Sequence, residues 1–412
     1  MNIVFIHQNM PGQFRHLIAH AASAGGHRVV CVGRRKDFAP SGIGRVTYDL
    51  PDSVLTDRNP FLTPFENAVR HGLQVARASQ ALAQNGFRPD LIVAHPGWGE
   101  SLYVKEIFPN VPLLHYCEFF YHPHGADTNF DPASQQDLTA NCATRTRNAH
   151  LLLALEAGDW GMSPTAWQKR QHPAAYQNRI SICFDGIDTD QARPDPDASF
   201  TFPDGTIARP GDPVVTYVAR NLEPYRGFPQ FMRAVPAILR ALPQARIAVV
   251  GADGVSYGKP PPDGGSWRAV MQAEIAPSLG ADAPRLHLLG PIPYDAYLRL
   301  LRVSAAHVYL TVPFVLSWSM LEAMSSGCVV VGSATPPVQE VIEDGKNGLL
   351  VDFFSPDAIA ARVVDAVRQG AALTPLRQAA RWTAISRYAL SRCVPAQLAL
   401  LDAVAAGRAP PG

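Results

Sequence analysis

Short runs of β-branched and aliphatic residues recur along this chain, and each run is followed by a segment of helical character. Strands that are apolar on both faces and separated by helices are typical of parallel sheets covered by helices on both sides. The pattern occurs twice, so we predict an α/β protein with two doubly wound, Rossmann-like domains facing a central cleft. The expected strands are 3–6, 28–32, 91–94 and 111–117 in the first half, then 214–218, 246–250, 286–289, 307–310, 329–331 and 348–351.

A segment rich in proline, aspartate and glycine separates the two halves, and these residues favour turns. We therefore predict a first domain over 1–190, a linker over 191–213 and a second domain over 214–373. Thr374 followed by Pro375 has the pattern of a helix start, which predicts a helical segment over 374–412 that packs back on the first domain.

Composition narrows the class of protein. Of the 412 residues, 47% are hydrophobic and 17% charged, which is typical of a globular protein. A formal net charge of +1 gives no electrostatic basis for binding nucleic acid. Six cysteines without a CxxC pair predict a reducing compartment, and the opening residues lack the pattern of a secretory signal, so we expect a cytoplasmic protein.

Two features bear on membranes. Residues 303–321 contain no charged residue, but Pro313, His307 and several hydroxyls predict a strand, a loop and a helix start rather than a membrane span. The first fifty residues carry six basic residues against two acidic ones. A solvated face explains this excess most simply, and the alternatives are an anionic acceptor or peripheral contact with the inner face of the membrane.

Residues 311–332 carry the strongest functional pattern. Ser317, Trp318 and Ser319 open an apolar helix that contains one acid, Glu322. Unpaired backbone N–H groups and partial positive charge make a helix start a natural seat for a diphosphate. A carboxylate about one turn further along is placed to accept hydrogen bonds from a ribose diol. The alternative is a capping box, in which Ser319 and Glu322 only close the helix start.

Two arginines, Arg220 and Arg226, follow the expected strand 214–218 and precede a helix. Guanidinium groups bind phosphate oxygens in pairs and stay charged, so these two can hold a diphosphate and stabilise the charge that builds on it as it leaves. The alternative is a pair of surface arginines in ion pairs with Glu223 or other acids.

Glycine turns follow several of the expected strands. Gly12, Gly251 and Gly290 allow close approach of a ligand to the backbone, and Pro291 and Ile292 come directly after the last of them. We expect a phosphate or sugar at Gly12 and a base or ribose at the other two turns. An ordinary strand-to-helix turn is the alternative for Gly12.

In the first half, Glu118 falls at the end of the expected strand 111–117. There it could bind a sugar hydroxyl, polarise an acceptor or support positive charge at an anomeric carbon. Alternation along a strand sends His115 and Cys117 to the opposite face, which argues against a metal site formed with Glu118 and the nearby histidines. Further candidates on the acceptor side are His95, Trp98, His122 and His124.

Together these residues resemble those of retaining glycosyltransferases of family 4, which have the GT-B architecture of two Rossmann-like domains. The resemblance spans nearly the whole chain, and the opening 7–16, HQNMPGQFRH, is similar to one bacterial subgroup in particular. The motifs that carry it are Gly12, 26–29, 184–188, 220–227, 321–327 and 338–348.

The resemblance implies roles for matching residues. Arg220 matches the arginine that stabilises the departing diphosphate, and Arg226 stands where a lysine assists it. Glu322 matches the acid that holds the ribose. Residues 317–319 match the helix start whose amides face the phosphates, and Leu321 lies in the same donor-binding motif.

Three positions depart from the family pattern. Phe314 stands where the first acid of a paired-glutamate motif contacts the donor sugar, so the pattern leaves that sugar unspecified. The two basic residues are one position further apart than usual, with Arg226 in place of lysine. Glu118 stands where the family often has a histidine.

The resemblance implies a metal-independent retaining glycosyltransferase without a cofactor. Its donor would be a UDP- or GDP-linked sugar, and its acceptor a hydroxyl of a sugar, a lipid-linked compound or a small molecule. Synthesis of a bacterial polysaccharide, glycolipid or other glycoconjugate is the expected setting. Two alternatives stay open: a sugar-nucleotide epimerase or hydrolase with the same donor site, and a catalytically silent binding partner, which Phe314 favours.

Overall fold

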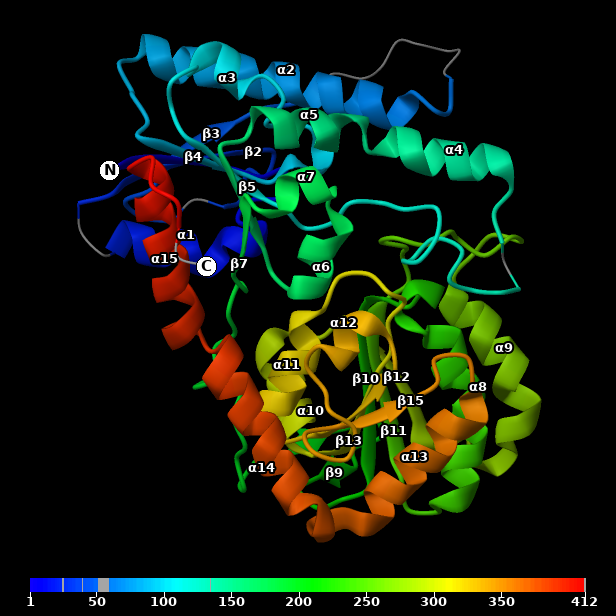
Figure 1. Cartoon of the computed structure of the whole chain (residues 1–412). Coiled ribbons are helices and arrows are strands. Elements are labelled where there is room, and N and C mark those ends of the chain that lie inside the picture. The colour runs from blue at the N-terminus through cyan, green and yellow to red at the C-terminus, as the bar shows by residue number, and fades with distance from the viewer. Residues whose placement is uncertain (24–25, 39, 51–58, 134, 411–412) are drawn as a thin grey trace. The chain divides into compact units, whose positions relative to one another are not determined.

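The computed structural model describes residues 1–23, 26–38, 40–50, 59–133 and 135–410, which form two compact units. Unit 1 comprises Met1–Gly186 and Leu390–Gly412, and unit 2 comprises Ile187–Ala389 (Figure 1). Each unit contains a parallel sheet with helices packed on it, so the prediction of two Rossmann-like domains is confirmed.

The sheet of unit 1 has seven parallel strands in the order β3-β2-β1-β4-β5-β6-β7. The chain fills one side of β1 first and then the other, so the direction of winding reverses between β1 and β4. Ligands of such sheets bind beyond the carboxyl ends of the strands at this reversal. The strands are β1 (Asn2–Ile6), β2 (Arg28–Gly33), β3 (Gly44–Thr47), β4 (Leu91–Ala94), β5 (Leu113–Tyr116), β6 (Trp160–Ser163) and β7 (Ile180–Ile182).

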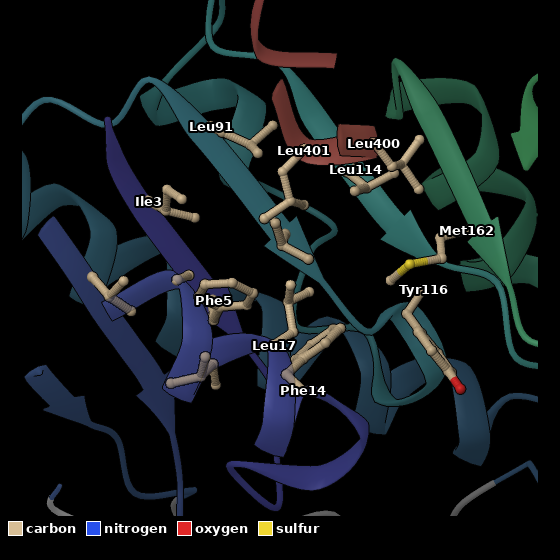
Figure 2. Close-up of a cluster of buried hydrophobic side chains, with 14 of the residues drawn as sticks. Ile3, Phe5, Phe14, Leu17, Leu91, Leu114, Tyr116, Met162, Leu400 and Leu401 are labelled. Atoms are coloured by element: carbon tan, nitrogen blue, oxygen red, sulfur yellow. The ribbon is translucent and has the colours of Figure 1, made fainter. Parts of the chain in front are cut away.

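Alternate residues of β1 serve two cores. Ile3 and Phe5 face α1 (Arg15–Ser23) and α15 (Leu390–Ala405), and α15 contributes Leu400 and Leu401 to this cluster (Figure 2). Val4 and Ile6 face the opposite core, which is covered by α2 (Thr63–Gln84). Burying one such aliphatic side chain contributes about 1.5–3 kcal/mol. The shorter helices of unit 1 are α3 (Val104–Ile107), α4 (Leu138–Arg147), α5 (Ala149–Ala157), α6 (Ala166–Gln171) and α7 (Ala174–Gln177), with 3-10 turns at Gly12–Phe14 and Pro96–Trp98.

Unit 2 has six parallel strands in the order β12-β11-β10-β13-β14-β15, and its winding reverses between β10 and β13. The strands are β10 (Val214–Asn221), β11 (Arg246–Ala252), β12 (Leu286–Gly290), β13 (Ser304–Tyr309), β14 (Val329–Ser333) and β15 (Leu349–Val351). The helices are α8 (Phe228–Ala241), α9 (Trp267–Leu279), α10 (Tyr294–Arg302), α11 (Trp318–Ser325), α12 (Pro336–Gln339), α13 (Pro356–Gln369) and α14 (Thr374–Thr383). Shorter turns are the 3-10 segments Pro224–Arg226, Gly280–Arg285 and Gly370–Leu373 and the π-helical Ala384–Tyr388.

The unit boundaries differ from the predicted ones. Residues 191–213, predicted as a linker, lie inside unit 2, where β8 (Phe200–Thr201) pairs with β9 (Ile207–Ala208). Phe200 and Phe202 pack against Val214 and Ala248 in the same core, because the segment holds apolar residues between its prolines. The predicted segment 374–412 divides: α14 belongs to unit 2 and α15 to unit 1.

No helix in the described part of the chain is both long and apolar enough to span a membrane. Residues 303–321 form β13, a loop and the start of α11, as the sequence predicts.

Candidate functional site

Arg220, Arg226 and the start of α11 with Glu322 lie at or after the carboxyl ends of β10 and β13, where unit 2 reverses its winding. Of the other residues expected to bind the donor, Gly251, Pro291 and Ile292 lie at the ends of β11 and β12, and Gly12 lies in unit 1. Arg220 is the next-to-last residue of β10 and is exposed to solvent. Arg226 ends the turn Pro224–Arg226 and is held firmly. Its Nη1 donates to Thr311 Oγ1 at 2.8 Å, to the carbonyl of Val315 at 3.1 Å and to the Tyr309 hydroxyl at 3.3 Å. Arg226 is therefore a fixed cation at the end of β13.

The sequence left open a surface ion pair between these arginines and Glu223, but the carboxylate of Glu223 binds backbone N–H groups instead. Glu223 is 1% exposed, and its side chain accepts backbone N–H groups from Gly258 at 2.9 Å and from Ser256 and Tyr257 at 3.2 Å. The carboxylate thus fixes the loop between β11 and α9. Fixing the loop brings the Tyr257 ring to 5.7 Å from the Arg226 guanidinium.

Phe314, the departure from the family's acid, lies in an aromatic cluster beside this loop. The Phe314 side chain is 2% exposed, with ring centroids of Tyr257 and Tyr225 at 4.9 and 5.7 Å. The three rings make an apolar wall next to Arg226, where the family pattern would put a carboxylate.

Helix α11 begins with its backbone donors uncovered by a side chain. Ser317 is the N-cap residue, but its hydroxyl makes no capping hydrogen bond and lies 3.0 Å from the Ser319 hydroxyl. The Ser317 N–H donates to Tyr309 at 2.9 Å, which ties the helix start to the phenol that also contacts Arg226. Trp318 is 39% exposed, whereas the Leu321 side chain is buried in the core. The start of α11 therefore has no capping hydrogen bond from the side chain of its N-cap residue, and a helix start of this kind can seat an anion.

Glu322 lies one turn into α11, and two side chains of another helix, α10, donate hydrogen bonds to its carboxylate. Oε1 accepts from the Tyr294 hydroxyl and Oε2 from the Tyr297 hydroxyl, each at 2.8 Å. Both tyrosines belong to α10. The capping box that the sequence left open would instead have used the backbone of Ser319.

Gly251 and Gly290, the two glycine turns of unit 2, require glycine for different physical reasons. A Cβ at Gly251 would lie 2.7 Å from both the carbonyl of Ala219 and the Leu222 side chain, so packing between β10 and β11 requires glycine there. Gly290 has a φ of +69°, and Pro291 after it is exposed. Ile292 packs against the core that includes Phe200.

The expected acceptor-side residues lie where unit 1 reverses its winding, after β1, β4 and β5. Gln13 connects Glu118 to His7, which was not among the expected residues: Gln13 Oε1 lies 2.8 Å from His7 Nε2, and Gln13 Nε2 donates to Glu118 Oε1 at 2.7 Å. His7 Nδ1 accepts the Asn9 N–H at 2.9 Å, so the proton of this ring is on Nε2. Burial and the nearby His95 lower the pKa of His7 to about 3.

Gly12 serves His7. A Cβ at Gly12 would lie 2.3 Å from His7 Nε2, so the imidazole occupies the space that any side chain would fill. The φ of Gly12 is +51°, which also favours glycine.

His95 lies beside the second oxygen of Glu118. His95 Nδ1 accepts the Gly97 N–H at 3.1 Å, and Nε2 lies 3.5 Å from Glu118 Oε2. Burial raises the pKa of Glu118, but hydrogen bonds from His95 and Gln13 outweigh it and place the pKa below the usual value. His95 stacks on Tyr116 with ring centroids 5.4 Å apart. The ring centroid of Trp98 lies 4.8 Å from that of His95. Glu118 is thus a fixed, ionised carboxylate.

A cavity of about 40 Å³ adjoins Glu118, which is room for a few water molecules. His95, His115, Cys117 and His172 line it together with apolar residues. In the part of the chain that the structure describes, no three His, Cys, Asp or Glu side chains are arranged to hold a metal ion.

Among the described residues, the network of polar contacts that joins Glu118, Gln13, His7 and His95 does not include His122 or His124. His122 Nε2 lies 2.7 Å from the carbonyl of Gln171, which closes the end of α6, and His124 is exposed. Residues that the sequence analysis did not select are His7, Gln13, Tyr294 and Tyr297. His7 and Gln13 had a signal, since His7 directly follows the first strand and Gln13 directly follows Gly12, whereas the two tyrosines had none.

Two glycosyltransferase family models match the chain: "Glycosyl transferase family 4 group" over residues 25–192 and "Glycosyl transferases group 1" over 212–369. A D-inositol 3-phosphate glycosyltransferase of Nocardioides sp. is 28% identical over 242 residues, which are 55% of this chain and 50% of that protein. A GDP-mannose-dependent alpha-(1-6)-phosphatidylinositol monomannoside mannosyltransferase of Mycolicibacterium smegmatis is 28% identical over 218 residues, 50% of each. The matches span about half the length of these curated relatives.

Solved structures agree over almost the whole chain. Sucrose-phosphate synthase from Thermosynechococcus elongatus superposes with a TM-score of 0.69 at 19% identity, covering 99% of this chain and 100% of that one. HepE from Anabaena, in complex with UDP-glucose, superposes with a TM-score of 0.66 at 14% identity, covering 98% and 100%. Likeness at these identities shows the fold, which is GT-B.

Proposed function

We propose that this chain, which matches the models of two glycosyltransferase groups, is a glycosyltransferase that transfers a sugar, with retention, from a nucleotide diphosphate-sugar to an acceptor hydroxyl. The observation that carries the proposal is the set of donor-side groups at the β10/β13 reversal of unit 2. A fixed cation, an open helix start and an oriented carboxylate meet the three chemical parts of a nucleoside diphosphate: its charge, its phosphate oxygens and its ribose diol.

In the proposed reaction the bond between the anomeric carbon and the diphosphate oxygen breaks, and the acceptor oxygen bonds to the same face of that carbon. The acceptor's proton passes to the departing diphosphate, so no protein nucleophile and no metal ion is needed. Arg220 and Arg226 stabilise the charge that builds on the diphosphate. Arg226 lowers the barrier in particular, because its hydrogen bonds fix it before the reaction. The backbone N–H groups at the start of α11 add to this field.

We propose that unit 1 binds the acceptor. Glu118 is the candidate for orienting an acceptor hydroxyl, because the hydrogen bond from Gln13 fixes one of its oxygens, and Gln13 and the nearby His95 lower its pKa and keep it ionised. The sequence relatives are named for inositol phosphate and phosphatidylinositol mannoside acceptors, so polyol and lipid-linked hydroxyls are the first acceptors to try. We propose a cytoplasmic protein of bacterial glycoconjugate synthesis, with the inner membrane face as the place where a lipid-linked acceptor would meet it.

The donor site is tested by calorimetry with UDP, GDP and ADP and their sugar conjugates, on the wild type and on Glu322→Ala. HepE was solved with UDP-glucose and one relative is named as GDP-mannose-dependent, so UDP and GDP compounds come first. A ligand that binds the native state stabilises it by about 2.7 kcal/mol at a hundredfold excess over Kd. We expect one nucleotide to bind the wild type and to lose at least about tenfold in affinity with Glu322→Ala, or 1.4 kcal/mol.

Arg240→Ala serves as a control, since Arg240 is an exposed arginine at the far end of α8 and should leave nucleotide binding unchanged. Free sugar produced from a bound donor without any acceptor would support the hydrolase alternative. Absence of binding by every nucleotide would contradict the enzyme and support the silent partner that the aromatic wall around Phe314 suggests.

A further inference from the structure

Two tyrosines on one face of α10 hold the carboxylate of Glu322. Tyr294 and Tyr297 are three residues apart, a spacing that puts their side chains next to each other on a helix, and their ring centroids are 5.8 Å apart. Each hydroxyl donates to a different carboxylate oxygen at 2.8 Å. Two donors on two oxygens fix both the direction and the plane of the carboxylate, which a single hydrogen bond would not.

The two tyrosines differ in their surroundings. Tyr297 is 7% exposed, and burial, together with the adjacent Glu322, raises its pKa well above the usual value. Its hydroxyl therefore stays protonated and donates under all ordinary conditions. Tyr294 is 41% exposed and opens α10, directly after Pro291, Ile292 and Pro293. The buried tyrosine anchors the carboxylate, and the exposed one stands at the rim where we expect the nucleotide.

We propose that Tyr297 and Tyr294 are positioning residues that set Glu322 for the ribose diol of the donor, and that this makes the site select ribonucleotides over 2′-deoxyribonucleotides. The inference rests on the proposed function, since it concerns the same nucleotide. A carboxylate has about four acceptor positions, and two tyrosine hydroxyls fill two of them. A carboxylate already fixed in direction binds a diol without losing further side-chain freedom, whereas a free one must first be ordered.

Deoxynucleotide discrimination follows from the same geometry. The half-buried carboxylate of Glu322, oriented for a hydroxyl, loses that hydrogen bond when the 2′-OH is absent, so the deoxy ligand binds more weakly. A carboxylate released from its tyrosines turns to other partners and loses the distinction. The tyrosines should thus affect the ratio of the two affinities, and not merely their level.

The test measures Kd by calorimetry for UDP, GDP and ADP and for their 2′-deoxy counterparts. The proteins are the wild type, Tyr297→Phe, Tyr294→Phe and Tyr176→Phe, the last a control tyrosine on α7 of unit 1. For the nucleotide that the wild type binds, we expect a ribo-to-deoxy preference of about tenfold. We expect Tyr297→Phe to reduce this preference to about twofold by weakening the ribonucleotide, with deoxynucleotide affinity unchanged. Tyr176→Phe should match the wild type.

Three results would overturn the inference: a wild type that binds both forms equally, a Tyr297→Phe variant that keeps the preference, or one that loses affinity for both forms equally. The last would indicate that Tyr297 only supports the packing of α10. Tyr294→Phe provides the same comparison at an exposed position if the buried substitution prevents folding. A wild type that binds no nucleotide would contradict the proposed function itself, which is a different outcome from any of these.

Discussion

Gly12 is the residue at which backbone geometry decides the arrangement of the acceptor-side network. We expect Gly12→Ala to be destabilising by about 2–4 kcal/mol, of which about 1–2 kcal/mol is the cost of a left-handed backbone for alanine and the rest the overlap with the His7 ring. Gly86→Ala is the matched control, because Gly86 has a φ of +80° and nothing within 4 Å of its would-be Cβ. Urea unfolding of both variants separates the two costs. Equal losses in the two would show that His7 is not constrained by Gly12.

Glu100 makes stability depend on pH around neutrality. The Glu100 side chain is completely buried, and burial, opposed by the hydrogen bond from Tyr48 and by Arg34, raises its pKa to about 7. His71, which contacts the same Tyr48 hydroxyl, has its pKa lowered to about 4 by burial and is neutral there. In the unfolded chain Glu100 loses its proton near its ordinary pKa. At this site the native state therefore binds more protons than the unfolded state between about pH 4.5 and 7, so the contribution of Glu100 to stability falls as pH rises through this window.

We expect Glu100→Gln to remove this dependence. The variant should gain stability over the wild type as pH rises from 5 to 8, at up to about 1.4 kcal/mol for each unit of the removed pKa shift. Guanidinium unfolding at several pH values measures it, with Glu274→Gln, a partly exposed surface acid paired with Arg233, as the control. A constant difference between Glu100→Gln and wild type across the range would contradict the raised pKa.

At the scale of single elements, Glu223 determines the course of the loop between β11 and α9. Glu223→Gln keeps the size of the side chain but replaces a carboxylate that serves three N–H groups, and losing part of these bonds should cost about 1–3 kcal/mol. Hydrogen exchange at Ser256, Tyr257 and Gly258 should become faster. The control is Asp253→Asn in the same loop, since the Asp253–Arg268 ion pair lies at the surface and contributes little. Unchanged exchange in Glu223→Gln would mean that the aromatic rings alone hold the loop.

The candidate site could be predicted to the extent that its residues follow strands. Arg226, Glu118 and Glu322 were found because strand ends and helix starts are visible in the sequence. Their partners were not, since Gln13 and Glu118 are 105 residues apart and Tyr294 and Glu322 are 28 apart, and only the packing of whole elements brings them together. Phe314 could be recognised as a departure, but its contacts with Tyr257 depend on a loop held by Glu223.

At the scale of the whole molecule, the strands with continuous apolar runs could be predicted and those without such runs could not. The ten predicted strands correspond to β1, β2, β4, β5 and β10–β15, because their residues are buried on both faces and so read as continuous apolar runs. β3 (Gly44–Thr47) was missed because it is an edge strand with largely exposed residues. β6 (Trp160–Ser163) and β7 (Ile180–Ile182) were missed because neither contains a continuous run of β-branched and aliphatic residues. The division of 374–412 was missed because periodicity does not show which core a helix joins.

Because units 1 and 2 each bury their own hydrophobic side chains, we expect two thermal transitions, each sensitive to substitutions in one unit. Leu401→Ala removes a side chain from the core of unit 1 and should cost about 2–5 kcal/mol there. Leu301→Ala is its counterpart in unit 2, with the same 1% exposure. Calorimetric scans should show that Leu401→Ala lowers the transition temperature of unit 1 and that Leu301→Ala lowers that of unit 2. The bound nucleotide should raise only the transition temperature of unit 2. Joint movement of both transitions in either variant would show that the units unfold as one.

The helix α15 also sets an order of events during synthesis. The sheet of unit 1 leaves the ribosome first, yet Leu400 and Leu401, which complete its core, are translated after all of residues 187–389. At 5–20 residues per second, that interval is about 10–40 s. Unit 2 is whole before unit 1 is. Throughout this interval the nascent chain carries an uncovered apolar sheet face around Phe5 and Leu114, and a chaperone that binds emerging polypeptides would find its target there.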